Sequence, residues 1–270
     1  MKIRAIILSA LILCGISAVI MYSRAAQPQQ KSSVITQAIN DKNTPMVIKN
    51  LILKMKEQME VNDDQFPELI KEVENYTNSC ADSASVAVLH SMLAEMYQNY
   101  YQRNQWTINQ RTQLSGYIPE DIRVWTSNLF TNKIKEEIDL SLRPTALLQN
   151  TPVSKFKDIL EIGKDSQTLR PTLYEFLAFR ALDIQPTVQI YKDLIAFQNK
   201  EPNMKSVLLT ELDYLRFLYG DKRDKESFVA YMNALDELYR NLASQNYAAE
   251  ILIAKLDLVS GSMFRYVSTQ

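Results

Sequence analysis

Residues 228–242, FVAYMNALDELYRNL, carry the most regular hydrophobic pattern of the chain. Large apolar side chains recur every three or four residues, at Phe228, Tyr231, Met232, Leu235, Leu238, Tyr239 and Leu242. This spacing brings them onto one face of an α-helix, because the helix completes a turn in about 3.6 residues. The stretch therefore predicts an amphipathic helix with one face in a core.

The same period recurs along the chain. Apolar residues step by four in 47–59 and 130–142, and they alternate by three and four in 86–100. Proline residues separate these runs or stand in a first helical turn, where proline is tolerated. No alternating strand pattern exceeds about four residues. We predict an all-α array of about ten short antiparallel helices, a tetratricopeptide-like α-solenoid, although no strict repeat near the ~34-residue period is found.

Composition excludes several functional classes. The 270 residues contain 30 Lys and Arg against 31 Asp and Glu, so no strong basic field exists to bind nucleic acid. One His leaves no partner for a two-His metal site, and five Gly give little support for a phosphate-binding loop. We therefore expect no metal, no cofactor and no nucleic-acid partner.

The N-terminus has the features of an export signal. Lys2 and Arg4 precede an apolar stretch over residues 5–22, and small residues follow at Ala25 and Ala26. We expect cleavage after one of these two alanines, so residues 1–25 form the signal peptide and the product is exported to the periplasm or cell envelope. Two alternatives remain: an uncleaved membrane anchor, since the apolar stretch is long for a signal, and a lipoprotein anchored at Cys14.

The remaining organisation follows from composition. Residues 26–33 are polar and predict a flexible linker, and residues 34–270 predict the helical domain. The chain ends directly after the apolar run 247–259, without the polar closing helix that a repeat array needs for solubility. We therefore expect the helical domain to be truncated and to stack on further chain.

No constellation of residues predicts an enzyme. His90 lies within a helical run and is interpreted as a packing residue, and Cys80 as a small residue at a helix boundary. The carboxylates of Glu136, Glu137 and Asp139 are expected on a solvated helix face, with Glu137 beside Lys133 one turn earlier.

The longest stretch without clear periodicity covers residues 105–122. Its aromatic residues, Trp106 and Tyr117, predict an ordered loop packed by aromatic side chains. Because aromatic and arginine side chains dominate interface energy, candidate partner contacts are drawn from this region and from the arginine-containing segments. These candidates are Tyr100, Tyr101, Trp106 and Trp125, followed by Arg170 and Arg180. Tyr100, Tyr101 and Trp106 could equally be ordinary aromatic packing between helices, and either arginine could instead pair with a helix carboxylate.

Three segments carry a resemblance to a known family. They are residues 89–106 (LHSMLAEMYQNYYQRNQW), residues 121–125 (DIRVW) and residues 169–183 (LRPTLYEFLAFRALD). Behind an export signal, and in this order, they resemble the helical N-terminal region of the large alpha-2-macroglobulin-like proteins of Bacteroidetes. The resemblance covers most of the chain after the signal.

That resemblance implies an envelope protein whose later β-sandwich domains trap attacking endopeptidases. The Cys-x-Glu-Gln thioester of many family members is not found, because Cys80 is followed by Ala81 and Asp82. We therefore expect a non-catalytic helical scaffold that docks a protein, either its own downstream domains or an envelope partner, and a membrane only through an uncleaved N-terminus. The alternative is a free-standing exported tetratricopeptide-like binding module without an inhibitory role.

Overall fold

The computed structural model describes residues 35–39, 43–61, 65–112, 117–160, 163, 165–200, 203–222 and 224–267. The predicted signal peptide, Cys14 and the linker lie outside these residues. Contacts divide the chain into two units, residues 1–63 and residues 64–270. Each unit is described separately below.

In the first unit, residues 35–39 are helical and α3 spans Thr44–Val61. The predicted apolar stripe forms the buried side of α3, since Val47, Leu51 and Met55 are each at most 5% exposed. The four-residue spacing therefore predicted correctly which face of this helix is buried.

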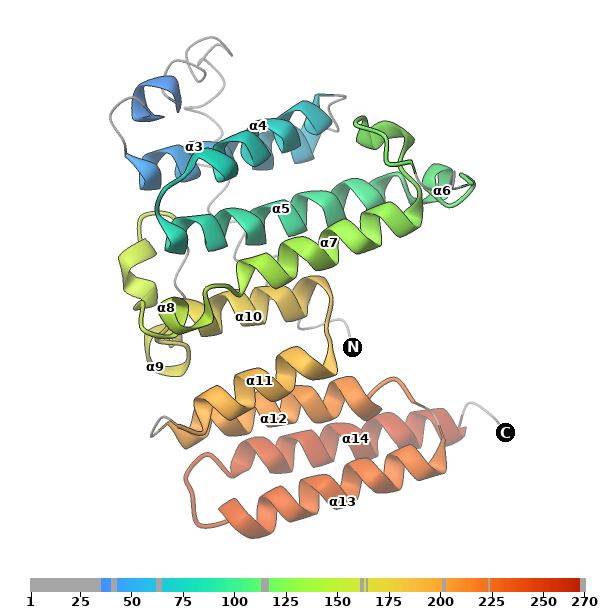
Figure 1. The fold of residues 1–270 in the computed structure, drawn as a ribbon. Helices are drawn as coiled ribbons and strands as arrows, with labels where there is room; N and C mark the ends of the chain where they lie inside the picture. Colours follow the sequence, from blue (N-terminus) through green and yellow to red (C-terminus); the bar gives the residue numbers. More distant parts are fainter. Residues whose placement is uncertain are drawn as a thin grey trace. The chain divides into compact units, whose positions relative to one another are not determined.

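The second unit is built from helices joined by short connections (Figure 1). Its first helices are α4 (Phe66–Ser79), α5 (Ser83–Arg103), α6 (Gln105–Ile108), the 3-10 helix η1 (Ile122–Val124), α7 (Ser127–Ser141), α8 (Thr145–Gln149), the 3-10 helix η2 (Val153–Phe156) and α9 (Ser166–Leu169). The later helices are α10 (Leu173–Ile184), α11 (Val188–Gln198), α12 (Met204–Tyr219), α13 (Lys225–Leu242) and α14 (Ala249–Val267).

Helix α5 is the centre of the first half of this unit. It packs against α4, α7 and α10, and α4, α5 and α7 run antiparallel in succession (Figure 1). Leu89, Leu93 and Met96 of α5 are at most 1% exposed, as their spacing predicts. The helix begins at Asp82, whose carboxylate accepts a hydrogen bond from the backbone N–H of Ser85 at 3.2 Å.

The second half continues as a succession of packed helices. α10 contacts α11, α11 contacts α12, and α12, α13 and α14 contact one another. Leu235 of the opening stripe is fully buried in the core of these last three helices, together with Leu208 of α12 and Ile251 of α14. Leu238, Tyr239 and Leu242 of the same stripe are half-buried and pack against this core, so the stripe faces it as predicted.

The prediction of an all-α fold is confirmed over the residues that the structure describes. They contain no strand, and the β-type contact found among them is a single bridge between Pro152 and Thr172. The helices are more numerous than expected because short ones such as α6, α8 and α9 escape detection by periodicity, which needs several turns. Within the described residues, no helix combines the length and the apolar composition needed to span a membrane.

Candidate functional site

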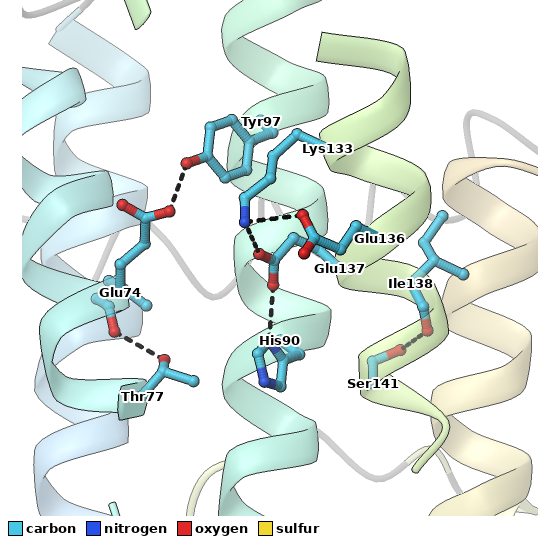
Figure 2. Close-up of polar contacts among 10 residues, drawn as sticks. Glu74, Thr77, His90, Tyr97, Lys133, Glu136, Glu137, Ile138 and Ser141 are labelled. Carbon is cyan, nitrogen blue, oxygen red and sulfur yellow. Dashed lines mark hydrogen bonds and ion pairs between the residues drawn. The ribbon is translucent and has the colours of Figure 1, made fainter. Parts of the chain in front are cut away.

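A buried polar cluster joins α5 to α7. It consists of His90 on α5 and of Lys133 and Glu137, one helical turn apart on α7, with the exposed Glu136 at its edge (Figure 2). His90 Nδ1 lies 2.6 Å from Glu137 Oε2, and Lys133 Nζ lies 2.8 Å from Glu137 Oε1. Both carboxylate oxygens of Glu137 are thus satisfied, one from each helix.

The prediction that Glu137 lies on a solvated face is wrong. Its side chain is 3% exposed, whereas that of its neighbour Glu136 is 58% exposed. The sequence did hold a signal for this: Glu137 follows Ile134 by three residues and Phe130 by seven, so it shares the predicted apolar face of α7. The expected pairing of Glu137 with Lys133 is confirmed.

Electrostatics in the cluster favour the charged forms of Glu137 and Lys133. Burial alone would raise the pKa of Glu137, but hydrogen bonds from His90 and Lys133 lower it below its ordinary value. Burial alone would lower the pKa of Lys133, yet its contacts with Glu137 and Glu136 raise it. Glu137 and Lys133 therefore form a buried ion pair at neutral pH, and His90 braces it from the facing helix.

Two further polar contacts connect α5 to its other neighbours. Tyr97 donates a hydrogen bond to Glu74 Oε1 of α4 at 2.7 Å, and burial together with this bond raises the pKa of Tyr97 (Figure 2). Arg180 of α10 donates to Ser91 Oγ at 2.9 Å and to Glu95 Oε2 at 2.6 Å. Each helix packed on α5 is therefore tied to it by a charged or buried polar contact as well as by apolar packing.

The predicted partner-contact residues fall into different environments. Trp125 is 8% exposed, stacks on Tyr97 with ring centroids 5.7 Å apart, and donates from Nε1 to the carbonyl of Pro119 at 2.7 Å. Tyr100 and Tyr101 are half-buried and stack on Phe130 at 5.6 and 5.8 Å. These three aromatic residues form one cluster, centred on Phe130, between α5 and α7.

The remaining candidates differ again. Trp106 is 79% exposed, so the prediction that aromatic packing orders residues 105–122 is wrong at this residue and at Tyr117, which is 60% exposed. Arg170 lies over the ring of Phe179, 3.5 Å from its centroid, and Arg180 pairs with a helix carboxylate, which was the alternative left open for it.

The connection between α5 and α7, residues 104–126, also holds exposed residues that the sequence did not single out. Ile118 is 69% exposed and Val124 is 55% exposed. Within this connection, Arg111 donates to the carbonyl of Trp125 at 2.7 Å, and Arg123 pairs with Glu68 of α4 at 2.5 Å. We call the exposed large apolar residues described in this connection, Trp106, Tyr117, Ile118 and Val124, the apolar edge.

Neither region has the composition of a metal centre. Among the described residues, no group of three or more His, Cys, Asp or Glu side chains is arranged to hold a metal ion. Cys80 ends α4, at the helix boundary where the sequence predicts it, and its thiol is not in a disulfide.

Comparison with known proteins gives no relative. No protein-family model, no curated protein and no solved structure matches the chain.

Proposed function

We propose that this chain is a non-catalytic helical docking region that binds another protein domain through the apolar edge of its α5–α7 connection. The observation that carries the proposal is the exposure of Trp106 and Ile118, 79% and 69%, on a connection that Arg123 ties to Glu68 of α4. Exposed large apolar side chains beyond what a solvated surface needs are a feature of protein-binding surfaces. Tryptophan and tyrosine contribute more binding energy than most residue types.

The burial of the polar cluster supports a structural rather than a catalytic role for it. Glu137 has both of its oxygens occupied by His90 and Lys133. A general base needs a reacting group within hydrogen-bond reach, and a nucleophile needs a base beside it. The contacts of the described cluster instead tie one helix to the next. In this proposal they hold α5 and α7, the two helices that the connection joins, in register.

The family part of the proposal rests on the three segments that resemble alpha-2-macroglobulin-like proteins. They cover most of α5 with the start of α6, η1, and nearly all of α10. On this proposal the chain is the exported helical lead-in of such a protein in the periplasm or cell envelope. Inhibition of endopeptidases would then belong to downstream domains, and those domains are the first candidates for the bound partner.

The size of the native product tests the family part. An immunoblot of cell fractions with an antibody against residues 40–260 should show an envelope band several-fold heavier than 31.1 kDa. A band at or just below 31.1 kDa would contradict the macroglobulin proposal and favour the alternative of a free-standing exported binding module. Helix pairs such as α12 with α13 have the length that this alternative requires.

A binding experiment tests the docking part independently of size. The amount of partner that co-purifies with the tagged protein should fall by about tenfold or more in the double variant Trp106→Ala, Ile118→Ser. The variant removes two exposed apolar side chains that the proposal places in the interface. The matched control is Leu256→Ala, which truncates another exposed side chain, 67% exposed, on α14. Equal recovery of the partner by both variants would show that the apolar edge is not the docking surface.

A further inference from the structure

We propose that the buried polar cluster is an acid-sensitive latch, which holds α7 against α5 at neutral pH and releases α7 when Glu137 takes up a proton. This inference is independent of the docking proposal. It concerns how the two helices stay together and which part of the chain opens first in acid.

The geometry makes Glu137 the anion on which the latch depends. Lys133 Nζ has a second carboxylate at 3.1 Å, that of Glu136, but this side chain is 58% exposed and its attraction is screened by water. His90 approaches Glu137 from the facing helix, so this carboxylate has one partner on α5 and one on α7 (Figure 2). Neutralising it leaves Lys133 half-buried without its closest counter-charge, beside His90.

The other ionisable groups facing the cluster do not replace this anion. Tyr97 of α5 is committed to Glu74 of α4, and that contact joins α5 to α4 rather than to α7. Charges further along α5 are likewise occupied, because Glu95 pairs with Arg180 of α10. Acid therefore acts most directly on the α5–α7 contact, and the helical signal of the other helices should be retained because Glu137 takes no part in their contacts.

The pKa of Glu137 agrees with this direction. Burial raises it, but the hydrogen bonds from His90 and Lys133 more than offset burial and lower it below the ordinary value of 4.5. A depressed folded-state pKa stabilises the folded form fully above the unfolded value, and this stabilisation is lost as the pH falls through the folded value. The latch should accordingly open below pH 4.5.

The aromatic cluster supplies a local reporter of this opening. Trp125 packs against Phe130 of α7, with ring centroids 5.3 Å apart, so movement of α7 changes the surroundings of its indole. The chain has two tryptophans, and Trp106 is 79% exposed. Replacing Trp106 with Phe therefore leaves Trp125 as the fluorescent reporter with little effect on packing.

The experiment follows Trp125 emission and far-ultraviolet circular dichroism of the Trp106→Phe protein during acid titration. Emission should shift to longer wavelength at a pH where the helical signal is still retained. Amide exchange of α7 in the wild-type chain provides a second measurement that does not need the substitution. Its protection factors should fall on the order of 100-fold across the same transition, the size expected when one partner of a buried pair is removed.

Matched variants attribute the transition to the cluster. Lys133→Met combined with Glu137→Gln removes both buried charges, so the early Trp125 transition should disappear, while Glu136→Gln should leave it unchanged. The proposal is overturned if Trp125 and the helical signal change together, if Trp125 does not respond before unfolding, or if the charge-free variant opens at the same pH as wild type.

Discussion

At the scale of single residues, Glu137 and Glu136 show how neighbouring carboxylates acquire different roles. They are adjacent on α7, yet one side chain is 3% exposed and the other 58%. Burial makes the first dependent on its partners, because an ion removed from water needs compensating contacts. The exposed carboxylate interacts with the same lysine but has water as an alternative.

Removal of the buried charge should cost much more stability than removal of the exposed one. Glu137→Gln keeps the shape of the side chain but leaves Lys133 without its closest counter-charge, so the free energy of unfolding at pH 7 should fall by about 3–5 kcal/mol. Glu136→Gln should change it by less than ~1 kcal/mol. Urea unfolding measures both, and equal losses would show that the burial of Glu137 has no energetic consequence.

The two tryptophans offer a second comparison at this scale. Trp125→Ala empties a site in the aromatic cluster and should cost about 3–5 kcal/mol of stability, since it removes a large buried side chain. Trp106→Ala should stay within about 0.5 kcal/mol, because its side chain is 79% exposed. Thermal or urea unfolding measures the stability of both variants. A large loss of stability in Trp106→Ala would identify Trp106 as a core residue.

At the scale of helices, local sequence determines where several elements begin. Thr172 and Glu175 form a capping box at the start of α10: the threonine hydroxyl accepts from the backbone N–H of Glu175, and the glutamate accepts from the N–H of Thr172. The Thr-x-x-Glu spacing is visible in the sequence. It falls within residues 169–183, one of the segments that carry the family resemblance. Two of the residues behind that resemblance therefore also cap a helix.

Loss of this cap should weaken α10. Thr172→Ala removes the hydroxyl and should lower the free energy of unfolding by about 1 kcal/mol. Thr172→Ser keeps a hydroxyl in the same place and should retain most of that stability. Amide exchange in the first turn of α10 should rise in the alanine variant, and identical exchange in the two variants would contradict the role of the cap.

Helices and their buried faces were predictable because both depend on residues a few positions apart. The stripes of α3, α5 and α13, and the cap at Asp82, follow from such spacing. The buried cluster was not predicted, because it pairs His90 with a residue 47 positions away. Pattern alone does not reveal which polar residue on an apolar face finds a partner on another helix.

Exposure of the apolar edge escaped prediction for a related reason. Trp106 and Trp125 both lie near the α5–α7 connection and are both aromatic, so sequence treated them alike. The structure separates them because Trp125 reaches Phe130 and Tyr97 while Trp106 projects from the short helix α6. Such a difference depends on the path of the connection in space, which local propensity does not define.

At the scale of the molecule, the first half of the second unit is a set of helices packed on α5, with exposed apolar side chains on the connection between α5 and α7. Polar contacts connect α5 to α4, α7 and α10, and they provide a firm support for that connection. A preorganised surface loses less entropy when it binds than a mobile one does. This is the physical basis for proposing a docking role.

Site-specific photo-crosslinking tests this central claim most directly. A benzophenone amino acid is placed at position 106 or 118 in cells that make the protein natively, with position 135 on the exposed side of α7 as the control. The account predicts a discrete protein adduct, or an internal crosslink to a downstream domain, from 106 and 118 and not from 135. Absence of any adduct at 106 and 118, or the same adducts at 135, would contradict it.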